Sequence, residues 1–187
     1  MLFRLLSDPD KNIRSAPRFW DINNSEWFAK EVNYMASKGY IEGYPEGDFR
    51  PDNPITRAEF ATMISRFDDI VNSGENMFVD IETHWAWLYI NNVAERGWVS
   101  GFGKGIFGPD INITRAQVVK IINRMLHREI DIKDIPGWAR TFIDVSDDYW
   151  AFTDIVEASN GHEYVRNEDG FTEHWVNWLD WDSVPDS

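Results

Sequence analysis

The feature that most restricts the fold of this chain is an internal repeat. Residues 19–22, Phe-Trp-Asp-Ile, match residues 78–81, Phe-Val-Asp-Ile, and the following stretches stay in register at a constant offset of about 58 residues. Ile-Thr-Arg-Ala-Glu at 55–59 then aligns with Ile-Thr-Arg-Ala-Gln at 113–117. One small unit of structure therefore occurs at least twice, and neighbouring units are expected to share a core.

A third, incomplete copy comes after the matched pair. It opens at residues 142–145 and places Trp150 where Trp27 and Trp85 stand, but no Thr-Arg-Ala sequence comes after it. Instead, the chain carries Trp175 and Trp178 at a helix-like spacing, which predicts that they close the open end of the array.

The N-terminus resembles the end of an earlier copy, because Arg4 aligns with Arg66 and Arg124. We therefore expect the chain to be a fragment of a longer protein. The predicted divisions are 1–18, the tail of an upstream repeat plus a linker; 19–73 and 74–130, two full repeats; and 131–187, a degenerate third repeat with a C-terminal tail.

Each full copy predicts a helix, a glycine-rich turn and a second helix. The first helices are expected to start near Trp27, Trp85 and Trp150, and the first two to end before Gly39 and Gly97. The second helices show the spacing of one buried face, at Phe60, Met63, Ile64, Phe67 and Val71, and at Val118, Ile121, Ile122 and Met125.

The start of each second helix is marked by a capping box. Thr56 with Glu59, and Thr114 with Gln117, have the spacing at which the two side chains satisfy helix-end N–H groups reciprocally. Residues 129–141 are predicted to be a linker.

These motifs resemble the S-layer homology family. The resemblance rests on Phe-x-Asp-Ile at 19–22 and 78–81, His-Trp-Ala at 84–86, the turn at 43–51 and Ile-Thr-Arg-Ala-Glu at 55–59. It is strong from residue 19 to about 128 and weak from 142 to 171. It implies a mainly α fold, in which tandem helix-turn-helix repeats with short β-turns or strands take a pseudo-threefold arrangement.

The resemblance also implies a role. Members of this family anchor surface proteins non-covalently to the bacterial cell wall, outside the cell. The implied partner is an anionic, often pyruvylated, secondary cell-wall polysaccharide, or a peptidoglycan-associated glycan, bound in grooves between repeats. The ligand contacts that it implies are Arg57 and Arg115; the third copy has no equivalent.

The residues themselves leave two readings of Arg57 and Arg115 open. Each comes directly after the capping threonine, where its charge faces the positive end of the helix dipole at a cost of about 0.3–1 kcal/mol. A bound carboxylate or phosphate would reverse that cost. Alternatively, each Arg pairs with an acid such as Asp52 or Asp110 and only ties the turn to the helix.

The turn glycines and the repeated tryptophans are ambiguous in the same way. Gly43, Gly47, Gly101 and Gly105 allow close approach of a ligand to the backbone, or simply make the turn. Trp27, Trp85 and Trp150 share one repeat position, which favours a buried structural role over contact with a sugar.

Charge excludes several classes of function. The 18 basic and 32 acidic side chains among 187 residues give a net charge of -14, which opposes binding to nucleic acid. No apolar run is long enough for membrane insertion. A local anion site remains compatible with this charge, because salt screens the long-range field beyond about 10 Å.

No catalytic residue, metal ligand or cofactor is predicted. Cysteine is absent, and His162 begins a sequence that carries Arg166 where a zinc protease helix needs its second histidine. His84 and His127 are isolated. Two alternative functions stay open: a structural module for protein–protein assembly, and an accessory module of a polysaccharide-degrading enzyme.

Overall fold

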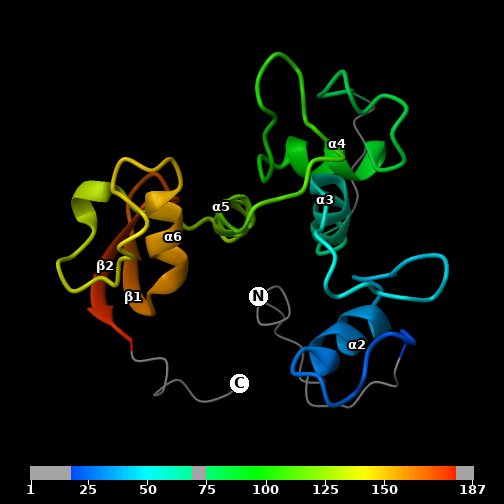
Figure 1. Ribbon diagram of the computed structural model, residues 1–187. Coiled ribbons are helices and arrows are strands. Elements are labelled where there is room, and N and C mark those ends of the chain that lie inside the picture. Colours follow the sequence, from blue (N-terminus) through cyan, green and yellow to red (C-terminus); the bar gives the residue numbers. More distant parts are fainter. Residues whose placement is uncertain (1–17, 69–74, 180–187) are drawn as a thin grey trace. The chain divides into compact units, whose positions relative to one another are not determined.

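The computed structural model describes residues 18–68 and 75–179 of the chain. The predicted upstream tail at 1–6 lies outside the described residues. The helices are α2 (Ala29–Ser37), α3 (Arg57–Ser65), α4 (Trp87–Glu95), α5 (Arg115–Met125) and α6 (Phe152–Ser159), with a 3-10 turn at Ile132–Asp134 (Figure 1). The strands β1 (His162–Arg166) and β2 (Glu173–Trp178) pair antiparallel. None of the helices in these ranges is both long and apolar enough to cross a membrane.

The described residues fall into two compact units. The first contains 18–68, 75–93 and 101–112; the second contains 94–100 and 113–179. Almost all of α4 therefore belongs to the first unit, whereas α5 belongs to the second. The two helices of the repeat at 74–130 thus contribute to different cores.

The predicted order of helix, turn and helix is confirmed in both full repeats, but α3 ends at Ser65, so Phe67 lies beyond it, and Val71 lies outside the described residues. Both capping boxes form, with the Thr56 and Thr114 side chains each accepting a hydrogen bond from the backbone N–H three residues later. The first helices α2, α4 and α6 begin two residues after the repeated tryptophans, at Ala29, Trp87 and Phe152. The described ranges are thus helix-rich, with one small two-stranded sheet.

In the first unit, an aspartate joins each Phe-x-Asp-Ile motif to the turn after the first helix. Asp21 accepts hydrogen bonds from the backbone N–H groups of Phe49 and Arg50, at 2.9 and 2.7 Å. Asp80 does the same with Phe107 and Gly108, at 2.8 and 2.7 Å. The motif is therefore a clamp that closes the loop of its own repeat.

The phenylalanine of the same motif explains two of the glycines. A Cβ on Gly43 would lie 2.2 Å from the Phe19 ring, and one on Gly101 would lie 2.8 Å from the Phe78 ring and 2.2 Å from the Ile106 carbonyl oxygen. Any side chain at either position would displace the ring that packs there. Phe19 belongs to a buried cluster with Ile22, Ala29, Val32 and Ala36.

The prediction that the repeated tryptophans are buried is wrong. Trp27, Trp85 and Trp150 are 88%, 61% and 53% exposed. They stand just before the first helices, outside the face that packs inward, and smaller side chains such as Ala29 and Val32 fill the core in their place.

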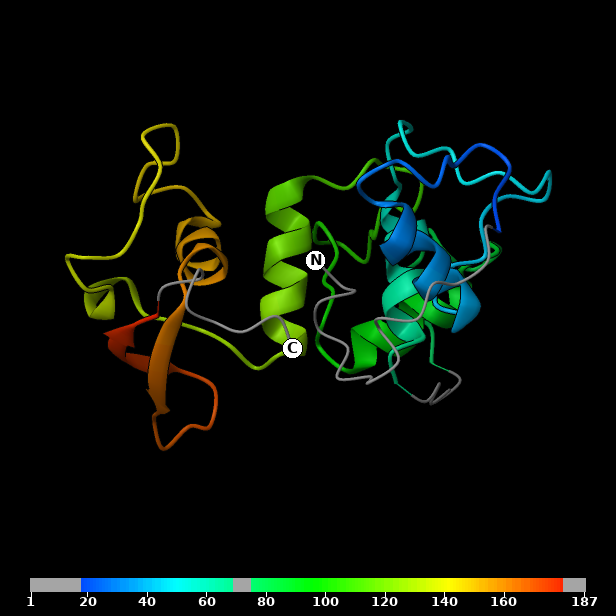
Figure 2. The same ribbon diagram turned by 90° about the horizontal axis from the view of Figure 1, so that it is seen from below.

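In the second unit, a β-hairpin replaces the glycine turn and second helix of a full repeat. Figure 2 shows β1 and β2 beside α6, which also contacts α5. Trp175 is buried with Ile130, Phe152 and Val156. Trp175 and Trp178 therefore lie on a strand, and the expectation of a helical spacing is wrong.

The segment at 129–141 is likewise part of this core. Ile130 is 2% exposed, and Ile135 and Ala139 pack against the same cluster. The prediction of a linker fails because apolar residues on either side of the aspartates pack with Phe152 of α6 and Trp175 of β2.

The clamp carboxylate predicts an acid-dependent loss of stability. Desolvation opposes ionisation of Asp80, but the two N–H donors and the Arg57 charge outweigh it and hold its pKa below the usual value. A lowered folded-state pKa contributes stability above the unfolded pKa of about 3.9, and this is lost as pH falls through the folded-state pKa. Asp80→Asn should lower the free energy of unfolding by about 1–2 kcal/mol at pH 7.

Urea denaturation at pH 7 and at pH 3, monitored by tryptophan fluorescence, measures both effects. The difference between wild type and Asp80→Asn should shrink at pH 3. Asp52→Asn, at an exposed carboxylate near the equivalent turn, is the control and should change little at either pH. Equal effects of the two substitutions would contradict the clamp.

Candidate functional site

Arg57, the first residue of α3, is buried against the loop of the next repeat. Its side chain Nε donates a hydrogen bond to the Phe107 carbonyl at 2.9 Å. The guanidinium carbon lies 4.6 and 4.4 Å from the ring centres of Phe102 and Phe107, and the residue is only 5% exposed. Arg57 therefore joins α3 to the 101–112 loop.

The same loop covers the start of α3. The backbone N–H groups of Arg57 and Ala58 donate to the carbonyls of Ile111 and Pro109, both at 2.9 Å. The next two N–H groups of the helix donate to Thr56, through its side chain and its carbonyl. The donors that an anion would use at this helix end are thus held by the protein itself.

The electrostatic partner of Arg57 is Asp80, rather than Asp52 or Asp110. Desolvation lowers the pKa of Arg57, and the Asp80 charge acts in the opposite direction. Because Asp80 is the clamp of the 101–112 loop, Arg57 and Asp80 support the same turn from two sides. This geometry corresponds to the reading in which the arginine ties the turn to the helix.

Arg115, the equivalent residue at the start of α5, is in a different environment. It is exposed, and within the described ranges no carbonyl covers the N–H groups of Arg115 and Ala116. The third repeat has a hairpin where a full repeat would supply the covering loop. Arg115 therefore lacks the loop contacts that hold Arg57.

The four glycines lie in the turns that precede α3 and α5. Gly47 and Gly105 adopt positive φ angles of 83° and 73°. Their carbonyls accept hydrogen bonds from the backbone of Trp20 and Val79, at 3.4 and 2.8 Å. Gly43 and Gly101 lie against phenylalanine rings, so all four glycines have a role within the turn.

A pocket in the second unit was not predicted from the sequence. It is open and has a volume of ≈ 520 Å³, and its eleven lining residues include four cations, Arg96, Lys120, Arg124 and Arg128, together with His127 and Phe171. Two carboxylates, Glu129 and Asp154, also line it. Four permanent positive charges therefore face two negative ones on a chain whose net charge is -14.

The cations of this pocket differ in how firmly they are paired. Lys120 Nζ lies 2.9 Å from Asp154, whereas Arg124 donates to the neutral hydroxyl of Ser100 at 3.4 Å. His127 packs against Phe171, with ring centres 5.3 Å apart. Lys120 and Arg124 are four residues apart on α5, a spacing that places both side chains on one helix face and could have indicated the pocket, whereas Arg128 comes after the end of the helix.

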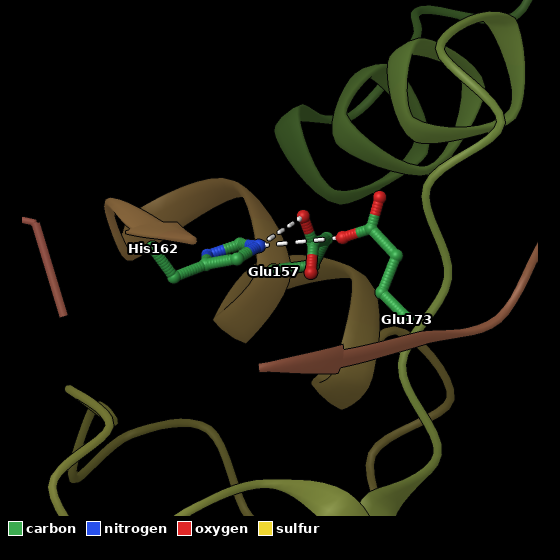
Figure 3. Close-up of side chains that lie close together, drawn as sticks. All are labelled: Glu157, His162 and Glu173. Atoms are coloured by element: carbon green, nitrogen blue, oxygen red, sulfur yellow. Dashed lines mark hydrogen bonds and ion pairs between the residues drawn. The ribbon is translucent and has the colours of Figure 1, made fainter. Parts of the chain in front are cut away.

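A second unpredicted cluster lies behind the pocket. Glu157, His162 and Glu173 are buried, and one ligand atom from each lies within 4.8 Å of the others (Figure 3). The sequence interpretation rejected His162 as a metal ligand because its motif lacks a second histidine. It did not consider Glu157 and Glu173, which lie on α6 and β2 and come close to His162 only in the folded chain.

Comparison with known proteins identifies the repeats. The family model of the S-layer homology domain matches residues 18–61 and 78–119. The chain is 35% identical over 179 residues to a cellulosome-anchoring protein of Acetivibrio thermocellus, covering 91% of this chain and 39% of that protein.

Two other relatives are similar over most of the chain. Cell surface glycoprotein 1 of A. thermocellus is 34% identical over 175 residues, which is 87% of this chain and 7% of the glycoprotein. The S-layer protein sap of Bacillus anthracis is 28% identical over 121 residues, or 64% of this chain and 15% of that protein. The chain thus spans well under half the length of each.

The two repeat arginines should differ in their effect on stability. Arg57→Ala removes a buried hydrogen bond and the contacts with two rings, so it should lower the free energy of unfolding by about 2–3 kcal/mol. Arg115→Ala, its repeat-equivalent control at an exposed site, should change it by less than about 0.5 kcal/mol. Urea denaturation of both variants measures this, and equal losses would refute the assigned roles.

Proposed function

Because the chain belongs to the S-layer homology family, we propose that it is a non-enzymatic module that anchors a bacterial surface protein to the cell wall. The names of the relatives support this proposal, since they include a cellulosome-anchoring protein, a cell surface glycoprotein and an S-layer protein. The module acts outside the cell. Its repeats take the pseudo-threefold arrangement that the family resemblance implies.

The ligand that we propose is an anionic secondary cell-wall polysaccharide, such as a pyruvylated one. The cation-lined pocket of the second unit is the observation that carries this proposal. Arg124 is bonded there to a neutral hydroxyl, so it can give a charge-assisted hydrogen bond to a sugar carboxylate. Phe171 and His127 offer ring surface to a sugar.

Arg115 supplies a second contact with the anionic ligand, at the opposite end of α5 from Arg124. Its guanidinium and the open N–H groups beside it can bind a carboxylate. Arg57 and the four turn glycines, Gly43, Gly47, Gly101 and Gly105, lie in the first unit, and we propose that they contribute to binding there. Their contacts within the protein favour a supporting role, in which they hold the loop at 101–112 and its counterpart in shape.

Assembly with other proteins is the second candidate function. It is favoured by the exposure of Trp27, Trp85 and Trp150. These tryptophans share one repeat position, and large solvent-exposed aromatic rings are suited to a protein–protein interface. A wall preparation stripped of its secondary polymer separates the two candidates. Only the glycan-binding function predicts that stripping abolishes binding.

Sedimentation with purified wall sacculi tests the proposed function directly. Arg115→Ala combined with Arg124→Ala should weaken binding at least about tenfold, since two charge-assisted contacts are lost. Binding by the wild-type chain should also weaken as salt is raised. Helical circular dichroism, recorded in parallel, should stay unchanged.

The matched control is Lys104→Asn. This change also removes a positive charge, but from an exposed turn outside the pocket, and asparagine tolerates the positive φ of 53° found there. It should leave sedimentation unaltered. Binding by the double arginine variant at the wild-type level would refute the glycan site, as would full binding to stripped sacculi.

A further inference from the structure

Three buried side chains from three elements meet in the second unit. Glu157 lies on α6, His162 is the first residue of β1 and Glu173 is the first of β2. Figure 3 shows both carboxylates turned toward the same ring nitrogen. His162 Nε2 lies 3.3 Å from Glu173 and 3.5 Å from Glu157, and none of the three side chains is more than 1% exposed.

The orientation of the His162 ring is set by its other nitrogen. Nδ1 lies 3.0 Å from the Asn160 carbonyl oxygen, which can only accept, so Nδ1 carries the proton. Trp175 stacks on the ring, with centres 3.9 Å apart and planes 17° from parallel. In the neutral ring, the Nε2 lone pair therefore faces two carboxylates, an arrangement that a cation between them would stabilise.

The two distances from His162 Nε2 to the carboxylate oxygens match a metal coordination shell. Zinc bonds of about 2.0–2.1 Å in a tetrahedron place neighbouring ligand atoms about 3.3–3.4 Å apart. A backbone carbonyl that holds Nδ1–H, as Asn160 does, is the usual support of a metal-bound histidine. We propose that Glu157, His162 and Glu173 form a binding site for one divalent transition-metal ion of the zinc class.

The Arg128 guanidinium supplies the positive charge in the structure as it stands. Its Nη2 lies 2.6 Å from Glu157 Oε1 and 3.0 Å from His162 Nε2, so it occupies the place that the ion would take. The Arg128 side chain is 28% exposed and also lines the open pocket, which gives it room to move out. A divalent ion would then balance the two carboxylates.

The two buried carboxylates are incompletely satisfied by the protein. Within the described part of the chain, Glu157 Oε1 and Glu173 Oε1 receive no hydrogen bond of good geometry. A metal bond would satisfy these oxygens: Arg128 lies 2.6 Å from Glu157 Oε1, whereas Arg128 and Arg166 lie only within 3.8 and 3.9 Å of Glu173 Oε1.

The ligand set selects the class of ion. One imidazole nitrogen with two carboxylates suits zinc and its neighbours, whereas calcium and magnesium sites are built from oxygen alone. The site would fasten the hairpin to α6. None of its three ligands lines the pocket that carries the proposed wall function, although Arg128, which the ion would displace, does.

Titration of the tag-free chain with Co²⁺ and Zn²⁺ tests the site. We expect one ion per chain, a visible Co²⁺ absorption band of tetrahedral type that Zn²⁺ removes, and a higher Tm with Zn²⁺. His162→Gln should weaken Zn²⁺ binding by about 100-fold or more. His127→Gln, at a histidine of the adjacent pocket, is the matched control and should bind as wild type does.

Arg128→Gln provides a test that leaves all three ligands in place. Removing the competing guanidinium should strengthen Zn²⁺ binding by about tenfold. Absence of saturable binding to the wild-type chain would overturn the proposal, as would binding that survives His162→Gln or weakens in Arg128→Gln. If circular dichroism shows that His162→Gln is unfolded, the Co²⁺ spectrum of the wild-type chain and the Zn²⁺ affinity of Arg128→Gln test the proposal in its place.

Discussion

The folded repeat depends on one carboxylate that binds two successive backbone N–H groups. Asp21 and Asp80 each reach from the start of a repeat to the turn before its second helix, and so fix where that helix begins. The phenylalanine two positions earlier packs against a glycine of the same turn. Without the carboxylate, the two N–H groups would need other partners, and the loop that covers α3 would lose its shape.

The contrast between Arg57 and Arg115 arises from the different segments C-terminal to their two repeats. The loop at 101–112 covers α3 and buries Arg57, whereas a hairpin comes after α6 and leaves Arg115 exposed. Identical motifs thus acquire different environments from their neighbours. In an array of this kind, the sequence of one repeat determines only part of the surroundings of such an arginine, because the segment that follows the repeat supplies the rest.

The helices and their capping boxes could be predicted because their signals are local. Thr56 and Glu59 satisfy each other within one turn, whatever surrounds them. The exposure of Trp27 could not be predicted, since it depends on which face of α2 turns inward. The hairpin was missed because Trp175 and Trp178 fit a helical spacing as well as a strand. The grouping of Glu157 with Glu173 required knowledge of that hairpin.

The division of the repeat at 74–130 between two compact units has a consequence for how such chains arise. The segment that is copied in the sequence differs from the segment that buries a core, because α4 packs with residues of the preceding repeat and α5 with residues of the third. A newly duplicated copy would therefore be inserted into existing cores at both ends instead of folding alone. Gain of whole copies preserves the packing of each helix with residues of the neighbouring repeat. Gain or loss of half a copy would instead leave a helix without its packing partner at each side.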